Sequence, residues 1–198
     1  MTKILAFAGS TRRDSLNKTL VKFAVDRARA AGGEVMLIDL RDFALPLYDG
    51  DLEEAEGSPA NATKLFELMK QHSGILLSCP EYNSSISGVL KNAIDWVSRP
   101  RQGELPLAAF SGKVAALLSA SPGALGGLRG LFHVRSILSN IGVLVIPNQV
   151  SVPQAHKAFD DKGELVDEGM SKKVSSLAHE LVDVTNKLSA SGSPTRKS

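Results

Sequence analysis

Three loops of the sequence carry side chains that could bind an anion or a flat polar ring. The first reads GSTRRDSLN, from residue 9 to residue 17, and runs directly into a segment with helical spacing. Hydroxyl groups, an arginine fork and an amide side chain suit a phosphate, and the free amides at a helix start add the positive end of a dipole. We interpret this loop as a site for a terminal phosphomonoester, with these candidate donors: Ser10, Thr11, Arg12, Ser15 and Asn17.

The alternative for this first loop is purely structural. In that interpretation Ser15 caps the helix and the arginines are solvated surface groups. Two nucleotide classes are disfavoured, because the loop lacks the second glycine and the lysine of a Walker motif and also lacks GxGxxG. A pyrophosphate needs that second glycine for close approach to the backbone.

The other two loops offer ring-binding and backbone-binding chemistry. PEYNSSISG follows a buried run at residue 80, where Tyr82 could lie along a heteroaromatic ring and the amides around Asn83 could bond its polar edge. An ordinary turn with a locally packed tyrosine is the alternative. SASPGALGGLRG, from residue 119, contains four glycines that allow a ligand close to the backbone, although such glycines also suit a plain strand–helix connection.

The elements that must position these loops alternate along the chain. Short apolar runs without polar alternation predict strands buried on both faces, and segments of helical spacing separate them. The predicted strands are 4–8, 35–40, 75–77, 114–118 and 143–146, and the predicted helices are 16–28, 62–69, 86–97, 128–138 and 170–188. The connections beginning at Arg41 and Pro147 are rich in turn residues and are predicted to be loops.

This alternation predicts an α/β fold, a doubly wound three-layer sandwich with a five-stranded parallel sheet in the order 2-1-3-4-5. In that order a ligand binds beyond the carboxyl ends of the strands, where the winding reverses between strands 1 and 3. All three loops follow strands at that edge. We expect one domain over residues 1–189 and a flexible tail over 190–198, where no apolar side chain is larger than alanine.

Composition excludes several classes of protein. The chain has 198 residues, 43% of them apolar and 22% charged, which fits one globular domain. The net charge of +2 predicts no nucleic-acid partner, and no apolar stretch approaches the roughly 20 residues that span a bilayer. A single cysteine makes no internal disulfide, so we expect a cytoplasmic protein without membrane partners. Cys79 is interpreted as a buried small hydrophobe, and the four histidines show no metal spacing.

Two segments closely resemble the NADPH-dependent FMN reductase family of flavodoxin-like proteins, which includes quinone, azo-dye and chromate reductases. They are GSTRRDSLN and PEYNSSISGVLKNAIDWVSR, in order and at the predicted switch point. LPLYDGDLE and SASPGALGGLRG are also similar to family segments, so the resemblance runs from about Lys3 to Leu188.

The resemblance implies one noncovalent FMN in each site. Its phosphate would be held by Ser10, Arg12, Ser15 and Asn17, and its isoalloxazine would be lined by Pro80, Glu81, Tyr82, Asn83 and Ser84. Ser119, Ser121 and Gly123 would close the far edge of the ring. Family members commonly form homodimers or homotetramers with the flavin near the interface, which would give Trp96 and Arg99 a partner chain. From its place at a helix end alone, Trp96 is interpreted as a core or an interface residue.

The implied activity is that of an NAD(P)H-dependent flavin oxidoreductase. NADPH or NADH reduces the bound FMN by hydride transfer, and a quinone, azo, flavin or metal-oxyanion acceptor then takes the electrons in a ping-pong mechanism. This chemistry needs no catalytic acid or base and no metal, and we assign none. Arg13, a second cation beside the phosphate loop, is a candidate for the extra phosphate of NADPH.

Two other functions stay open. A flavodoxin-type electron carrier would dock redox proteins instead of a nicotinamide, but the slightly basic chain and the pairing of Arg12 with Ser15 speak against it. A regulatory flavin-binding protein is neither supported nor excluded by any motif.

Overall fold

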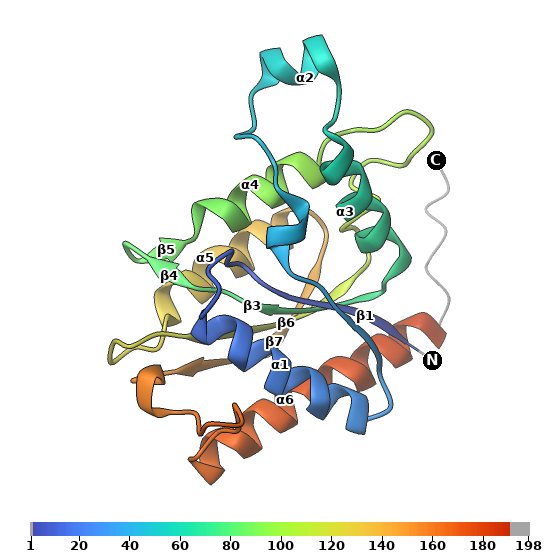
Figure 1. Cartoon of the computed structure of the whole chain (residues 1–198). Coiled ribbons are helices and arrows are strands. Elements are labelled where there is room, and N and C mark those ends of the chain that lie inside the picture. The colour runs from blue at the N-terminus through green and yellow to red at the C-terminus, as the bar shows by residue number, and fades with distance from the viewer. Residues whose placement is uncertain (1, 191–198) are drawn as a thin grey trace.

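A five-stranded parallel sheet forms the middle layer of the computed structural model, which describes residues 2–190 (Figure 1). The strand order is β2-β1-β3-β6-β7, which is the predicted order 2-1-3-4-5 counted over the five sheet strands. The strands are β1 Lys3–Ala8, β2 Glu34–Leu37, β3 Gly74–Ser78, β6 Val114–Ala120 and β7 Leu144–Val152. The predicted doubly wound topology is therefore confirmed.

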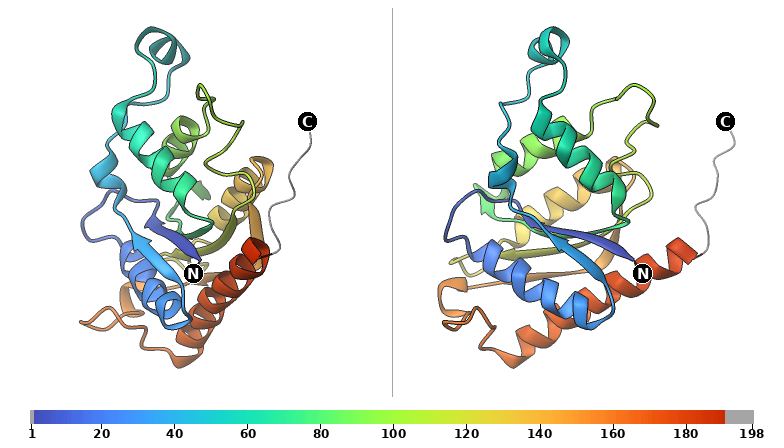
Figure 2. Two further views of the ribbon diagram at one scale, coloured as in Figure 1. Left: turned by 90° about the vertical axis from the view of Figure 1, so that its right-hand side faces the viewer. Right: turned by 45° about the vertical axis from the view of Figure 1, so that its right-hand side comes forward.

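Helices cover both faces of this sheet, which explains why its strands lack polar alternation. Helices α1 (Leu16–Ala30) and α6 (Glu168–Ala190) lie on one face, and α3 (Ala60–Gln71), α4 (Gly88–Val97) and α5 (Leu128–Asn140) lie on the other (Figures 1 and 2). Successive residues of each central strand enter opposite cores. Leu76 and Leu118 pack with α1 and α6, whereas Leu77 and Leu117 pack with the other three helices.

Four elements differ from the sequence-based prediction. β7 continues to Val152, so the predicted loop from Pro147 is wrong over residues 147–152; β7 is an edge strand, where proline is tolerated, and its register shifts beside β6. Conversely, β2 ends at Leu37. A small hairpin, β4 (Glu81–Tyr82) and β5 (Ser85–Ile86), precedes α4, which therefore begins two residues later than expected.

The remaining short elements lie in the two connections that were predicted as loops. A 3-10 turn, η1 (Leu40–Phe43), follows β2, and α2 (Gly50–Glu56) projects away from the sheet beyond α4 (Figures 1 and 2). A second 3-10 turn, η2 (Ala155–Lys157), follows β7. Helix α2 buries none of its residues, so its sequence has no apolar periodicity from which a helix could be predicted.

The predicted tail begins at Ala190, which ends α6, and its other residues lie outside the described part of the chain. Over residues 2–190, no helix combines the length and the apolar character needed to cross a membrane.

Candidate functional site

The three predicted loops meet at one edge of the sheet because β1, β3 and β6 are adjacent and parallel. Each loop leaves the carboxyl end of its strand, on the side of the molecule where the hairpin β4–β5 lies (Figure 1). Backbone bonds hold these ends together: the Gly9 amide donates to the carbonyl of Ser78 at 2.9 Å, and the Cys79 amide donates to the carbonyl of Leu118 at 2.7 Å. The sheet thus fixes the three loops relative to one another.

Asn17, in the first turn of α1, links the ends of β3 and β6 through its side chain. Its Oδ1 accepts from Ser78 Oγ at 2.8 Å and from the Ala120 amide at 3.0 Å, and its Nδ2 donates to the Ala120 carbonyl at 2.9 Å. Asn17 is 3% exposed. These bonds join the first turn of α1 to β3 and β6, so the structure shows a positioning role for Asn17; its predicted bond to phosphate stays a prediction.

Gly9, the first residue of the phosphate loop, lies directly against α4. A Cβ at this position would approach Leu90 Cδ2 to 2.9 Å, so only glycine fits without a shift. Ser87 adds a second link, because its hydroxyl donates to the Gly9 carbonyl at 2.6 Å and accepts from the Leu90 amide at 3.2 Å. One hydroxyl therefore caps α4 and fixes the end of β1.

The phosphate loop leaves its donors available for an anion. Ser15 is the residue before α1 and is buried, yet its side chain makes no capping bond, so the capping alternative is not supported. The first-turn amides of a helix have no partner within the helix and attract an anion. Ser10 is also buried, with its Oγ accepting from the Arg12 amide at 3.3 Å. Arg12 is exposed, and its guanidinium makes no bond within residues 2–190.

A second set of contacts holds the phosphate loop from outside. Arg41, at the start of η1, donates to the Thr11 carbonyl from Nη2 at 2.6 Å and from Nε at 3.1 Å. Asp39 accepts from the Arg41 amide at 3.0 Å and from Lys18 Nζ at 2.6 Å. Burial alone would raise the pKa of Asp39, but Lys18 and the Arg41 amide outweigh it and hold that pKa below its usual value.

Sequence reasoning missed Arg41, Asp39 and Ser87. The strand order 2-1-3-4-5 could have indicated Arg41 and Asp39. In that order strand 2 ends beside strand 1, so the turn that follows strand 2 must pass the loop at residues 9–15.

The second loop forms a tight hairpin with strained backbone at its tip. Asn83 and Ser84 have φ values of 50° and 63°, the left-handed region that serine seldom adopts, and they connect the two strands as a two-residue turn. Tyr82 precedes them and is 50% exposed. Pro80 is buried. An exposed aromatic ring beside strained residues is typical of a ligand-binding turn.

Helix α5 supports this hairpin with three hydrogen bonds. Its Gly130 amide donates to Glu81 Oε2 at 2.9 Å, Arg129 Nη1 donates to Ser84 Oγ at 3.3 Å, and His133 Nδ1 lies 2.9 Å from Ser85 Oγ. The residue before α5 is Gly127, which has no side chain to cap the helix, and the Glu81 carboxylate takes that role. The Glu81 side chain therefore points toward α5, so the predicted contact of Glu81 with the flavin ring would be made by its backbone.

The third loop uses two of its predicted side chains internally. Ser119 is buried and donates from Oγ to the Cys79 carbonyl at 2.6 Å, and a Cβ on Gly127 would overlap that hydroxyl. Ser121 Oγ accepts from the Gly123 amide at 3.2 Å. Gly123 itself is exposed, and a Cβ built there would meet only Ser121 Oγ, at 3.6 Å, so a ligand can approach this residue.

Cys79 and Trp96 are both enclosed within the chain. Burial raises the pKa of the Cys79 thiol far above its usual value, which confirms a small hydrophobic residue and not a nucleophile. Trp96 is fully buried, donates from Nε1 to the Pro46 carbonyl at 2.8 Å and packs edge-on against Tyr48. Of the two places that the sequence allowed for Trp96, the core and a subunit interface, the structure shows the core.

Arg99 also has partners inside the chain. Its Nε lies 3.0 Å from Glu53 Oε2, and its guanidinium carbon lies 5.3 Å from the centre of the Tyr48 ring. These contacts tie α2 to the end of α4, so Arg99 is already engaged before any partner chain arrives.

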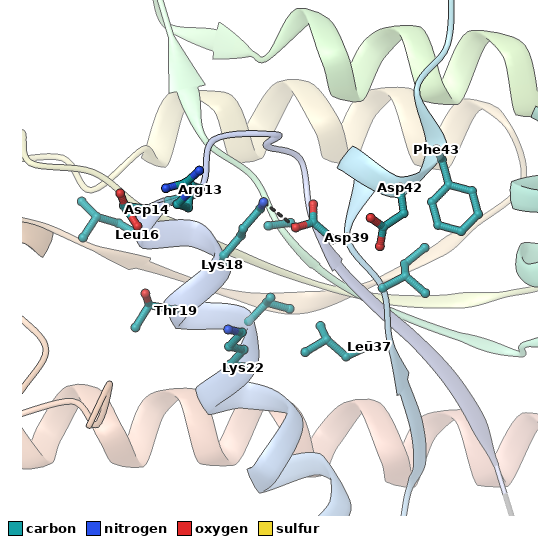
Figure 3. A pocket seen from close by; sticks show the side chains of 14 residues that line it. Arg13, Asp14, Leu16, Lys18, Thr19, Lys22, Leu37, Asp39, Asp42 and Phe43 are labelled. Atoms are coloured by element: carbon teal, nitrogen blue, oxygen red, sulfur yellow. Dashed lines mark hydrogen bonds and ion pairs between the residues drawn. The ribbon is translucent and has the colours of Figure 1, made fainter. Parts of the chain in front are cut away.

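A groove of about 790 Å³ lies on the outer side of the phosphate loop, between α1 and the turn after β2 (Figure 3). Lys18 crosses it to reach Asp39, and Arg13 and Lys22 line the α1 side. Tyr82, Asn83 and the third loop do not line this groove. The groove is therefore separate from the position predicted for a flavin ring.

The fold and the site together define a class: a flavodoxin-like α/β protein with a hydroxyl-rich loop at its topological switch point. Comparison with known proteins gives the family. The model of the NADPH-dependent FMN reductase family matches residues 2–157, and the chain belongs to this family. The expectation of an oxidoreductase that uses FMN and NAD(P)H is thereby confirmed.

Individual relatives agree with this assignment. An NAD(P)H-dependent FMN reductase of Pseudomonas aeruginosa is 38% identical over 168 residues, 84% of this chain and 85% of the relative. A quinone reductase of Escherichia coli K12 is 34% identical over 169 residues, 84% of this chain and 86% of that protein. Among solved structures, the flavoenzyme NAD(P)H:acceptor oxidoreductase FerB of Paracoccus denitrificans is similar with a TM-score of 0.79 and 29% identity, covering 94% of this chain and 98% of FerB.

The donor set of the first loop fits the phosphate end of FMN. Hydroxyls at Ser10 and Ser15, the guanidinium of Arg12 and the uncapped start of α1 are complementary to a phosphomonoester. An exposed Tyr82 beside the hairpin amides is suited to a flat ring with a polar edge.

Proposed function

We propose that this protein is an NAD(P)H-dependent flavin oxidoreductase with a ping-pong mechanism, which passes electrons to quinone, azo, flavin or metal-oxyanion acceptors. When bound, FMN supplies the hydride-accepting and electron-donating chemistry. The observation that carries the proposal is the uncapped, hydroxyl-rich start of α1, which lies at a strand end joined to the ends of β3 and β6 by Asn17.

In this proposal the chain binds the flavin, orients it and shields it from water, and no side chain transfers a proton. Ser10, Thr11, Arg12 and Ser15 hold the phosphate, and Asn17 fixes the loop beneath it. The backbone of residues 80–84 and the Tyr82 ring hold the isoalloxazine. Amides of the hairpin would stabilise negative charge at the edge of the ring.

An exposed face over the hairpin favours two small substrates that enter in turn. Tyr82 is half-exposed and the tip residues Asn83 and Ser84 are exposed, so a nicotinamide and then an acceptor can reach the same position. The relative named quinone reductase supports a small acceptor over a protein partner.

Steady-state kinetics test this proposal against an electron carrier. We expect sustained NADPH oxidation with a small quinone and no added protein, and parallel double-reciprocal plots when both substrates vary. A carrier would bind FMN and yet turn over only when a redox protein is added, and converging plots would contradict the ping-pong order.

Arg13 is the proposed contact for the 2′-phosphate of NADPH. It lines the groove of about 790 Å³ beside the phosphate loop, together with Lys18 and Lys22 (Figure 3). Arg13→Ala should raise the KM for NADPH by about tenfold and leave the KM for NADH nearly unchanged, the size expected for one charged hydrogen bond. Lys22→Ala is the control, because Lys22 lines the same groove one turn of α1 beyond Lys18. It distinguishes the loss of a specific contact from a general loss of positive charge. Equal effects of Arg13→Ala on both nucleotides would remove this role.

We also propose a homodimer or homotetramer in the cytoplasm. An exposed α2 arm and a reduced, buried Cys79 are in keeping with an assembling protein in a reducing compartment. The molecular mass in solution tests the assembly.

A further inference from the structure

Arg41 lies outside the segments that resemble the family and contacts the loop of residues 9–17 through two hydrogen bonds. Its two nitrogens donate to a single carbonyl, that of Thr11, at 2.6 Å and 3.1 Å. A guanidinium that donates twice to one acceptor fixes both the position and the direction of that acceptor. The Arg41 side chain therefore determines which way the peptide between Thr11 and Arg12 faces.

The direction of that peptide decides what the loop offers to an anion. In a planar trans peptide the carbonyl and the next amide point in opposite directions. Because the Thr11 carbonyl faces Arg41, the Arg12 amide faces the opposite way and donates to Ser10 Oγ at 3.3 Å. That amide and hydroxyl lie in the loop predicted to hold the phosphate.

Arg41 is itself held in place by a second pair of contacts. The Asp39 carboxylate accepts from the Arg41 backbone amide at 3.0 Å, and its other oxygen pairs with Lys18 Nζ at 2.6 Å. Lys18 belongs to the first turn of α1, so the turn after β2 is joined to the loop at Thr11 and to the helix at Lys18. The turn after β2 thus braces both the loop at Thr11 and the start of α1.

We propose that Arg41 is a positioning residue that makes the site selective for the phosphorylated flavin, FMN, over riboflavin. This inference rests on the proposed flavin site. Arg41 acts through the Thr11–Arg12 peptide and is outside the set of side chains that hold the phosphate, so its removal should weaken the recognition of the phosphate and spare that of the ring.

The test compares the binding of FMN and riboflavin to the full-length protein freed of flavin, followed by quenching of flavin fluorescence. We expect Arg41→Met to weaken FMN binding about fivefold, as expected for an exposed charged hydrogen bond, and to change riboflavin binding less than about twofold. Arg41→Lys, which keeps one charged donor, should recover part of the loss.

Arg29→Met is the matched control, because Arg29 Nη2 also donates to a backbone carbonyl, that of Val35 at 3.0 Å, far from the loop. It should leave the ratio of the two affinities unchanged. If Arg41→Met weakens both flavins equally, or behaves as Arg29→Met does, the selectivity role is refuted. If the unaltered protein binds no FMN, the proposed function itself fails, and that result is recognised before any variant is measured.

Discussion

Replacing Asn17 with alanine should destabilise the protein more than any exposed asparagine substitution, whether or not a flavin is present. The side chain makes three hydrogen bonds, of 2.8, 3.0 and 2.9 Å, to Ser78 and to both backbone groups of Ala120. All three residues are buried, with 3%, 0% and 4% of their surface exposed. Water therefore cannot replace the lost partner.

The expected magnitude follows from these three bonds. A buried polar group left without a partner costs about 1–3 kcal/mol, and relaxation around the small cavity recovers part of the sum. We expect the free energy of unfolding to fall by about 3–5 kcal/mol, a large share of a typical total. Asn61→Ala is the control, since the one bond of the Asn61 side chain, from Nδ2 to the Ala44 carbonyl at 3.0 Å, is exposed to solvent; its loss should cost less than about 1 kcal/mol.

Urea unfolding of the flavin-free protein, followed by circular dichroism, measures both variants. A loss for Asn17→Ala that does not exceed the loss for Asn61→Ala would refute the positioning role. In that case Asn17 would act only as a ligand of the phosphate, and its substitution would matter only when FMN is present.

Three further predictions concern Lys113, Glu81 and Ser15. Burial lowers the pKa of Lys113 to about 8, so between about pH 8 and 10.5 the unfolded chain binds more protons than the folded chain and stability rises with pH. The difference in unfolding free energy between the unaltered protein and Lys113→Met should therefore change by about 3 kcal/mol across that window. A constant difference would contradict the shift in pKa. Glu81→Ala should cost about 1 kcal/mol in thermal unfolding because it uncaps α5 at Gly130, whereas Glu81→Gln should cost less; a Glu81→Ala protein as stable as the unaltered one would show that the cap contributes nothing. Ser15→Ala should weaken FMN binding and leave the flavin-free protein almost as stable, since no capping bond is lost; a loss of about 1 kcal/mol without flavin would restore the capping interpretation.

The sequence was sufficient for the layers, the strand order and the loops that meet. Uninterrupted apolar runs such as residues 75–77 occur in strands buried on both faces, and their alternation with helical spacing allows few topologies. The loops at residues 9, 80 and 119 then had to converge, and Asn17 bonds to the ends of both neighbouring strands.

Contacts that depend on three-dimensional detail could not be predicted. The turn of the hairpin at Asn83 and Ser84 contains no glycine, so its positive φ values left no signal in the sequence. Trp96 at a helix end was compatible with either a core or an interface, and only the fold of residues 44–49 over it decides for the core. In the sequence Ser119 has no evident partner for its hydroxyl; in the structure that hydroxyl donates to the carbonyl of Cys79, the residue that follows β3.

The visible spectrum of the purified protein tests the central claim most directly, when it is followed under anaerobic conditions through the addition of NADPH. We expect the absorption of a bound flavin, release of FMN on denaturation, and bleaching of the visible band in proportion to added NADPH. A protein that remains colourless after incubation with FMN, or a bound flavin that NADPH does not bleach, would contradict the account.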